Sequence, residues 1–153
     1  MITPYFHVEE GAPAPLRIEL SRKVRFEEVD PLGIVWHGRY PGFFEDARVA
    51  LGDRYGIGYM DFYRNGVAAP IRKLHIDYFR PLRFQETFTI EGVIHWTEAA
   101  RLNMEFTLRN DAREVTTTGY SVQMMLDAER NFLLVLPPFY RDFMERWRKG
   151  ELA

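Results

Sequence analysis

The sequence predicts an α+β fold in which an antiparallel sheet of five or six strands wraps around one central helix. Three observations lead to this prediction. Several segments alternate apolar and polar residues with a period of two, which is typical of half-buried strands. One segment early in the chain repeats its apolar residues at helical spacing instead. This segment follows the first strand and precedes all the others, so a curved sheet around it is the simplest way to bury both.

The first strand is predicted over residues 17–26, where apolar side chains fall on one face and charged side chains on the other. On this reading Val24 and Phe26 continue the apolar face. Residues 1–15 precede the strand and contain Pro4, Pro13 and Pro15. Because proline blocks regular helix, we expect an extended arm that lies on the surface or on a partner subunit.

The central helix is predicted to follow a long loop and to run from Pro41 to about Gly56. Phe43, Ala47 and Leu51 recur at helical spacing. Proline suits a first helical turn and glycine suits a helix exit, so both ends carry the expected residues. About four turns of helix are expected, with a further short turn of helix before the Asn-Gly pair at 65–66.

Alternation with period two returns after Ala69 and predicts four further strands. Pro81 ends the first of them, because proline cannot sit within a buried ladder. The predicted strands occupy residues 69–80, 88–96, 101–109 and 114–126. Near the end of the chain, residues 137–149 place aromatic side chains four apart after a proline, which predicts an amphipathic helix that packs on the core or covers an edge.

Composition narrows the classes of function. The 153 residues fit one domain, residues 1–153, and 46% apolar with 27% charged residues is ordinary for a globular protein. A formal net charge of −2 provides no basic field, so neither nucleic acid nor membrane binding is predicted. The absence of cysteine removes thiol nucleophiles and zinc-thiolate sites. No signal segment or long apolar run occurs, so a cytoplasmic protein is expected.

Several kinds of catalytic chemistry are excluded because the sequence lacks the motifs that they require. Ser121 lies in a stretch that lacks the second glycine of a serine nucleophile elbow. The four histidines show no paired ligand spacing, so no metal is predicted. Neither a dinucleotide-binding glycine motif nor a phosphate-binding loop is present, and no cofactor is predicted. What remains is carboxylate and histidine chemistry assisted by backbone donors.

The loop before the helix, EVDPLGIVWHGRY at residues 28–40, carries the residue that raises the functional question. Asp30 stands among apolar neighbours, with no fixed basic partner close by in the sequence. A charge in apolar surroundings is costly. Asp30 therefore either forms a turn and points to water, which is common for Asp-Pro pairs, or is placed for chemistry.

The stretch DPLGIVWHGRYPGFFEDAR, residues 30–48, closely resembles the loop and central helix of hotdog-fold thioesterases of the 4-hydroxybenzoyl-CoA thioesterase-like family. The family pattern is roughly D-x-x-G-x-V-x-[HFN]-x-x-Y, followed by an aromatic residue, Glu, a small residue and Arg. A second stretch, HIDYFRPLRFQE at 75–86, resembles the next strand and its exit turn, with Gln-Glu replacing a common Gly-Asp pair. The resemblance in element order covers about residues 17–126.

The resemblance implies that Asp30 is the catalytic acid of an acyl-CoA thioesterase. It would attack the thioester carbonyl directly or deprotonate a water molecule that does so, and both routes stay open. Backbone N–H groups near Tyr40 to Phe43, aided by the helix dipole, would stabilise the developing oxyanion, with Pro41 donating none. His37 would position substrate or transfer a proton; the alternative is a packed loop histidine.

Further site residues follow from the same match. Gly33, Val35, Trp36 and Tyr40 would contact the substrate, although Tyr40 is also read as a structural aromatic residue at the helix entrance. Glu45 and Arg48, three residues apart, are expected to form an intrahelical ion pair. Because another branch of hotdog thioesterases carries its acid on the central helix, Glu45 and Asp46 are the reserve candidates.

The phosphates of CoA call for cations near the site. The densest basic group outside the C-terminal segment comprises Arg72, Lys73, Arg80 and Arg83. The alternative is that they are ordinary solvated charges. An acyl carrier protein would use the same charges, so the residues do not distinguish the two carriers.

Three functions are therefore compared. The leading one is hydrolysis of an acyl-CoA by a homodimer or homotetramer, because the resemblance implies a site formed between joined sheets. The second is a hotdog hydratase or dehydratase acting on 3-hydroxyacyl thioesters, which uses a histidine with an acid, as His37 with Glu45 would. The third is a module that binds acyl thioesters without turnover.

Overall fold

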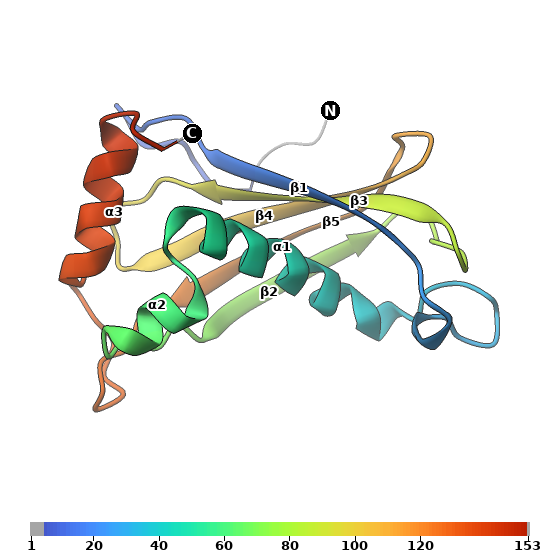
Figure 1. Ribbon diagram of the computed structural model, residues 1–153, viewed down its shortest axis with the longest axis horizontal. Coiled ribbons are helices and arrows are strands. Elements are labelled where there is room, and N and C mark those ends of the chain that lie inside the picture. Colours follow the sequence, from blue (N-terminus) through green and yellow to red (C-terminus); the bar gives the residue numbers. More distant parts are fainter. Residues whose placement is uncertain (1–4, 153) are drawn as a thin grey trace.

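The computed structural model describes residues 5–152, so the prediction for Pro4 and its neighbours in the arm lies outside the described residues. Figure 1 shows the arrangement of the elements. In chain order they are β1 (Leu16–Lys23), the 3₁₀ turns η1 (Phe26–Glu28) and η2 (His37–Arg39), α1 (Tyr40–Tyr55), α2 (Tyr59–Arg64), β2 (Ile71–Tyr78), β3 (Thr87–His95), β4 (Arg101–Asn110), β5 (Val115–Met124) and α3 (Pro138–Arg148).

The five strands form one antiparallel sheet in the order β1-β3-β4-β5-β2. β3, β4 and β5 follow one another as a meander, whereas β1 and β2, which flank α1 in the sequence, form the two edges. α1 lies across one face of this sheet (Figure 1). The predicted hotdog architecture, a sheet around one helix, is confirmed.

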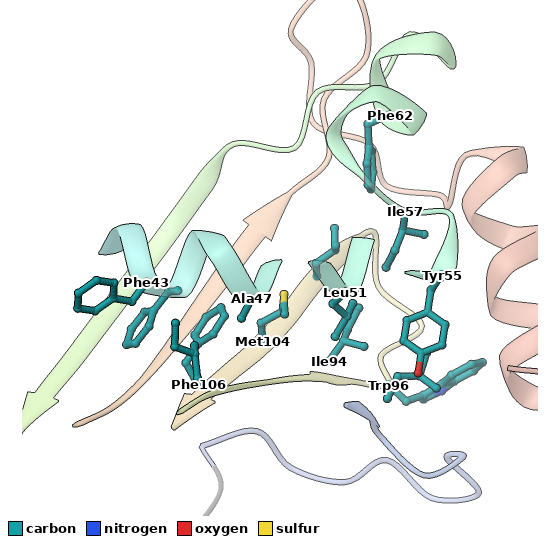
Figure 2. Close-up of a cluster of buried hydrophobic side chains, with 14 of the residues drawn as sticks. Phe43, Ala47, Leu51, Tyr55, Ile57, Phe62, Ile94, Trp96, Met104 and Phe106 are labelled. Carbon is teal, nitrogen blue, oxygen red and sulfur yellow. The ribbon is translucent and has the colours of Figure 1, made fainter. Parts of the chain in front are cut away.

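The core forms where α1 meets the inner face of the sheet. Phe43, Ala47 and Leu51, the predicted helix stripe, are buried and lie among strand residues such as Met104 and Phe106 (Figure 2). The helix can approach closely because Gly92 stands opposite it in β3. A Cβ atom at Gly92 would lie 3.0 Å from the Ala47 Cβ, tighter than ordinary contact. The strand glycine therefore sets how near the helix sits to the sheet.

The first strand is shorter than predicted. β1 ends at Lys23, and Phe26, expected on the buried face, is 77% exposed. The chain instead folds into η1, where the Glu28 carboxylate accepts a hydrogen bond from the Arg25 N–H at 2.8 Å. This local bond turns the chain before the alternation would have returned Phe26 to the core, so that part of the strand prediction is wrong.

The two ends of the chain pack on the same molecule. The Tyr5 ring stacks on Tyr120 with 3.7 Å between centroids, and the Trp147 Nε1–H donates to the Ala14 carbonyl at 2.8 Å. The described part of the arm thus lies on its own chain. α3 buries Trp147 against Trp96, so the C-terminal helix packs on the core at one end of the sheet (Figure 1).

The short helix expected before the Asn-Gly pair is confirmed as α2. No helix within residues 5–152 has the length and apolar character that crossing a membrane requires.

Candidate active site

The turn that carries Asp30 is held by its own backbone. The Asp30 N–H donates to the Ile34 carbonyl at 2.9 Å, and the Gly33 N–H donates to the Asp30 carbonyl at 2.9 Å. Gly33 has a φ of 76°, the left-handed conformation that side chains other than glycine rarely adopt. Glycine at this position therefore permits the backbone shape of the turn, and the predicted contact of Gly33 with substrate stays a prediction.

The Asp30 side chain is half-buried and takes part in its own turn, as one of the two readings of this residue predicted. One carboxylate oxygen accepts a hydrogen bond from the Leu32 N–H at 2.8 Å. In the part of the chain that the structure describes, no cation pairs with this carboxylate. A carboxylate has about four acceptor positions. Asp30 thus has acceptor capacity left over after it has stabilised its turn.

Asp30 opens into a hollow of about 300 Å³. We call this the Asp30 hollow; its lining comprises Asp30, Ile34, Val35, His37, Tyr40, Tyr78, Phe79, Arg80 and Pro81. The fold therefore brings together five of the residues predicted from the sequence. They come from the loop, from η2, from the first turn of α1 and from the segment just after β2.

Two tyrosines hold the walls of the Asp30 hollow. The Tyr78 hydroxyl donates to the backbone carbonyl of His37 at 2.8 Å, and the rings of Tyr40 and Tyr78 meet edge to face at 4.9 Å. Burial raises the pKa of Tyr40, whose hydroxyl hydrogen-bonds with the Thr117 side chain. Tyr40 is thus both a buried structural residue and part of the wall, so the two readings of this residue are compatible.

The positive end of the α1 dipole lies beside the Asp30 hollow, because Tyr40 is both the first residue of α1 and part of the lining. The first N–H groups of a helix have no acceptor within the helix. Pro41 stands in the first turn, so the donors of this turn come from its neighbours. This end of α1 can therefore stabilise negative charge that develops near Asp30.

The other predicted contacts lie farther out. Trp36 is exposed beside His37, with 5.1 Å between the rings, and is not part of the lining. Of the four predicted cations, Arg80 lines the Asp30 hollow and also pairs with Glu114 at 3.1 Å. Arg83 lies outside the lining. Arg72 and Lys73 stand at the opposite end of β2 and line a separate hollow on the outer face of the sheet.

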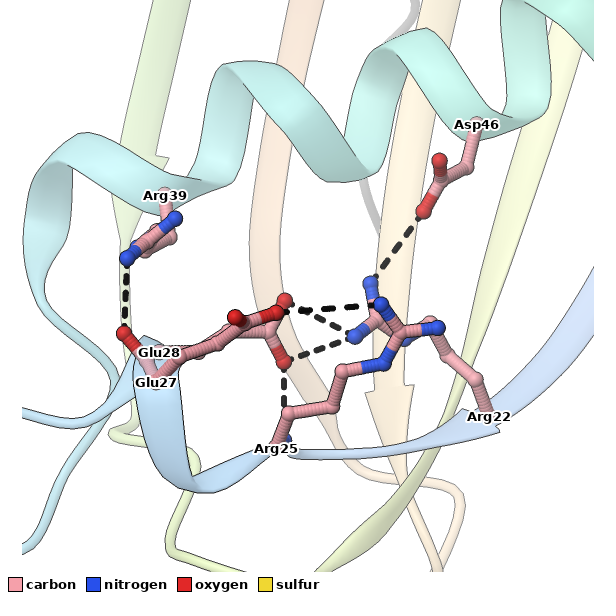
Figure 3. Close-up of polar contacts among 6 residues, drawn as sticks. All are labelled: Arg22, Arg25, Glu27, Glu28, Arg39 and Asp46. Carbon is pink, nitrogen blue, oxygen red and sulfur yellow. Dashed lines mark hydrogen bonds and ion pairs between the residues drawn. The ribbon is translucent and has the colours of Figure 1, made fainter.

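The two reserve acids on α1 are directed to different sides. Glu45 accepts a hydrogen bond from the Tyr59 hydroxyl at 2.6 Å and lines a smaller hollow of about 90 Å³ between α1 and β2. Asp46 instead pairs with Arg22 of β1 at 3.2 Å (Figure 3). His37 and Glu45, the pair that a hydratase would need, therefore line different hollows.

Arg48 does not form the ion pair expected with Glu45. It is 2% exposed, donates through Nε to the Gln123 side chain at 2.7 Å and lies over the Tyr59 ring at 4.7 Å. The residue therefore ties α1 to β5 and α2. The intrahelical prediction is wrong because spacing along a helix does not reveal that this position faces the sheet.

The sequence reasoning missed the support beneath the loop. Glu28 is buried and accepts two hydrogen bonds from the Arg22 guanidinium, at 2.7 and 2.8 Å (Figure 3). Arg39 donates to the Glu27 carbonyl at 2.7 Å, which links η1 to the turn just before α1. The alternating charge of the first strand hid this pair, because Arg22 falls on the inward face. Tyr78 was also missed as a wall residue of the Asp30 hollow. The alternation of apolar residues in β2 places it on the inward face, and this could have indicated its position.

Comparison with known proteins places the chain in a family. Residues 24–147 match the model of the thioesterase-like superfamily. A Bacillus subtilis (strain 168) protein named "Putative acyl-CoA thioesterase YneP" is 30% identical over 107 residues, which cover 70% of this chain and 78% of that protein. The acyl-CoA thioester hydrolase YbgC of Escherichia coli O6:H1 is 28% identical over 97 residues, 59% of this chain and 72% of YbgC.

A solved structure supports the same fold. DHNA-CoA thioesterase from Staphylococcus aureus superposes with a TM-score of 0.78 at 21% identity, covering 88% of this chain and 91% of that one. The match to the family model spans the Asp30 turn, α1 and all the strands after it. The chain belongs to the thioesterase-like superfamily.

Proposed function

We propose that this protein is a thioester hydrolase that cleaves an acyl-CoA to the free acid and CoA, with Asp30 as the reacting carboxylate. The observation that carries the proposal is the position of Asp30. Its carboxylate lines a hollow next to the positive end of α1 and has no cation partner among residues 5–152. The names of the Bacillus and Escherichia relatives, an acyl-CoA thioesterase and an acyl-CoA thioester hydrolase, favour the same substrate class.

Asp30 would act at the carbonyl carbon of the thioester by one of two routes. As a nucleophile, a carboxylate oxygen bonds to the acyl carbon, the C–S bond breaks, CoA leaves as thiolate, and water then hydrolyses the mixed anhydride. As a general base, Asp30 takes a proton from the water that attacks the same carbon. N–H groups of the first turn of α1 would hold the oxyanion; loss of one such donor typically costs about 10²–10³ in rate.

The other predicted residues take supporting roles in this proposal. Val35 and Tyr40 would form the wall against which the acyl group packs, and Gly33 would give the turn its shape. His37 would position the substrate or carry a proton between the leaving thiolate and solvent. Trp36 would contact the pantetheine arm from the rim. Arg80 would meet the phosphates, and Arg83 stays a predicted contact of the same kind.

We further propose that the protein works as a homodimer joined through β2. This strand pairs with β5 on one side and forms an edge of the sheet on the other. Exposed apolar residues lie along or just beyond it: Ile71, Leu74, Tyr78 and Phe79. Such an edge is a template for a second copy. An antiparallel pair of β2 strands would set Arg72 and Lys73 of one subunit beside the end of β2, and so beside the Asp30 hollow, of the other.

The test is turnover. Purified protein is incubated with acyl-CoAs that differ in chain length and ring content, and free thiol is followed with a thiol reagent. Hydrolysis of one class, lost in Asp30→Asn, is the expected result. Hydration of an enoyl-CoA without thiol release, or binding without either reaction, would contradict the proposal. Acyl carrier protein thioesters form a second series, and the cytoplasmic location stays a prediction.

Acid quenching during turnover separates the two routes for Asp30. Intact-mass measurement of the quenched protein would find the mass of the acyl group added if Asp30 is the nucleophile. It would find the unmodified mass if Asp30 activates water. Equilibrium sedimentation measures the mass of the protein in solution and so tests the dimer. The wild type is expected to have the mass of a dimer, and an edge-strand variant such as Leu74→Lys the mass of a monomer.

A further inference from the structure

The outer face of the sheet, opposite α1, carries a hollow separate from the Asp30 hollow. It has a volume of about 370 Å³ and lies over the start of β2, the start of β4 and the end of β5. We call it the outer-face hollow. Its lining includes Tyr5, Phe6, Arg72, Lys73, Arg101, Asn103 and Phe132. Register places Lys73 and Asn103 on either side of Val122, so both project from the same face.

The cations of the outer-face hollow lack carboxylate partners. Within residues 5–152, Arg72, Lys73 and Arg101 form no ion pair. Two other cations on this face are paired, Arg109 with Glu91 at 3.8 Å and Arg113 with Glu19 at 3.4 Å. Three unpaired cations around one hollow favour a ligand with several negative charges.

Asn103 on β4 provides a second, independent observation that points to a ligand. The residue is 6% exposed, and its side-chain carbonyl oxygen is buried without a hydrogen-bond donor in the described part of the chain. A buried acceptor left unpaired typically costs about 1–3 kcal/mol. Because the residue lines the outer-face hollow, a ligand there can supply the missing N–H. A simple inorganic anion has no such donor, so charge alone does not describe the ligand.

Aromatic side chains supply the third feature. Tyr5 and Phe6 of the N-terminal arm form one wall, and the stack of Tyr5 on Tyr120 fixes the position of its ring. Phe132 forms another wall and lies under the Arg72 guanidinium, 5.8 Å from it. Flat apolar walls beside cations accept a planar ring that is linked to anionic groups.

We propose that the outer-face hollow binds a purine nucleotide. Its phosphates meet Arg72, Lys73 and Arg101, and its base packs against the aromatic walls. An amino group of the base donates to the unpaired oxygen of Asn103. The volume lies within the range of small-molecule sites. Two sources share this chemistry, a free nucleotide and the nucleotide end of CoA.

Calorimetric titration of the full chain with ADP tests the proposal without turnover. One ADP is expected to bind per chain. The double variant Lys73→Gln/Arg101→Gln is expected to lose at least about 10-fold in affinity, because each charge-assisted contact contributes about 1.5–3 kcal/mol, roughly 10- to 150-fold. Arg109→Gln is the matched control: it lies on the same strand and face but is paired with Glu91. An affinity within 2-fold of wild type is expected for it.

Recognition of the base is tested with a second variant and a second probe. Asn103→Leu is expected to weaken ADP about 10-fold and to leave pyrophosphate affinity unchanged, because pyrophosphate has no N–H to donate. Its melting temperature without ligand is expected to match or exceed that of the wild type, which shows that the variant folds. An equal loss for both probes would overturn the role of Asn103.

Competition distinguishes the two sources. ADP that inhibits hydrolysis of an acyl-CoA, but not of the matching acyl-pantetheine, assigns the outer-face hollow to the nucleotide end of CoA. ADP that binds without inhibiting either reaction assigns it to a free nucleotide. Absence of ADP binding at about 5 mM, where a site with a Kd of about 1 mM would be mostly occupied, overturns the proposal, as does an equal loss in Arg109→Gln. Because Asp30→Asn should bind ADP as the wild type does, this result is independent of the proposed hydrolysis.

Discussion

Glu28 and Asp30 are two acids on one loop, two residues apart, and the fold gives them opposite surroundings. Glu28 is buried under α1 and accepts hydrogen bonds from the Arg22 guanidinium and from the Arg25 N–H. Asp30 accepts one bond from its own turn and opens into a hollow. Both oxygens of Glu28 accept hydrogen bonds that hold the loop, whereas Asp30 accepts one and keeps more acceptor positions for a substrate.

The difference arises from η1, which ends at Glu28. The 3₁₀ turn directs Glu28 inward toward Arg22, and the chain then pairs Val29 with Val35 before Asp30 begins its turn at the rim. The base of the loop is therefore rigid and its tip is open. This arrangement suits an acid that must be held in position by a support that does not neutralise it.

The largest expected effect is the loss of activity when Asp30, the acid that faces the hollow, is changed. Asp30→Asn keeps the size of the side chain and the oxygen that accepts from Leu32, but removes the charge that attack or proton transfer requires. We expect kcat to fall by about 10³, within the usual 10²–10⁴ for a catalytic acid or base, with unfolding free energy changed by less than about 1 kcal/mol. Glu27→Gln, an exposed acid of the same loop, is the matched control for thiol release and should stay within 2-fold. A rate above one tenth of wild type in Asp30→Asn would contradict the assignment.

The second effect is a loss of folding stability when Glu28, the buried acid of the same loop, is changed. Glu28→Gln leaves the Arg22 guanidinium with a weaker partner in a largely buried position. Breaking a fully buried pair costs about 3–5 kcal/mol; because Arg22 keeps Asp46, we expect about 2 kcal/mol. Urea unfolding measures it. Asp46→Asn removes the more exposed partner of the same arginine and should cost under about 1 kcal/mol. Equal losses in the two variants would show that burial does not separate them.

The third effect is on folding stability and concerns Gly33, in the turn that follows Asp30. Gly33→Ala forces a side chain into the left-handed conformation at φ 76°, where a Cβ would meet nothing within 4 Å. The cost is therefore purely conformational, about 1 kcal/mol, and thermal unfolding measures it. Gly42→Ala, at an equally open position in α1, should instead raise stability by about 0.5–1 kcal/mol. Destabilisation by both would point to crowding rather than backbone conformation.

The fourth effect is a modest one on the wall of the Asp30 hollow. Tyr78→Phe removes the hydrogen bond to the His37 carbonyl and leaves the ring contact with Tyr40. A neutral hydrogen bond contributes about 1 kcal/mol, so kcat/KM should fall about 5-fold. Tyr63→Phe removes a hydroxyl from an exposed ring elsewhere and should change nothing measurable. If Tyr78→Phe also leaves kcat/KM unchanged, η2 does not need this anchor.

The smallest effect tests whether a third acid behaves as Glu28 does. Burial by itself would raise the pKa of Glu105, but the hydrogen bond and charge of His95, with the N–H groups of Phe6 and Tyr5, hold that pKa below its usual value. A lowered folded pKa contributes stability that is present above the unfolded pKa, about 4.3, and is lost as pH falls through the folded value. Glu105→Gln should therefore lose under about 1 kcal/mol at pH 7 and less than that at pH 3, below the unfolded pKa of about 4.3. An equal loss at both pH values would assign the effect to packing.

Local patterns in the sequence were enough to predict α1 and the meander β3–β4–β5. The left-handed conformation of Gly33 was found only in the structure. Asp30 was selected through the resemblance to the thioesterase family, whose pattern from Asp30 through Gly33 and Val35 to Tyr40 lies within one continuous segment. The errors have a common origin. The burial of Phe26 and the Glu45–Arg48 ion pair were each inferred from neighbours in sequence. Arg48 contacts β5 and α2 instead of Glu45, and the bond between Glu28 and the Arg25 N–H turns the chain before Phe26 can reach the core.

The sequence by itself determined which segments alternate, where the helix begins and which acid stands in a turn, because periodicity and backbone preference act over a few residues. The tertiary structure decided that Tyr78 and Arg80 join Asp30, that Arg22 pairs with Glu28, and that Arg72 and Lys73 lie on the outer face beside Asn103. Those placements depend on strand order and register, which arise from burying all the apolar faces at once.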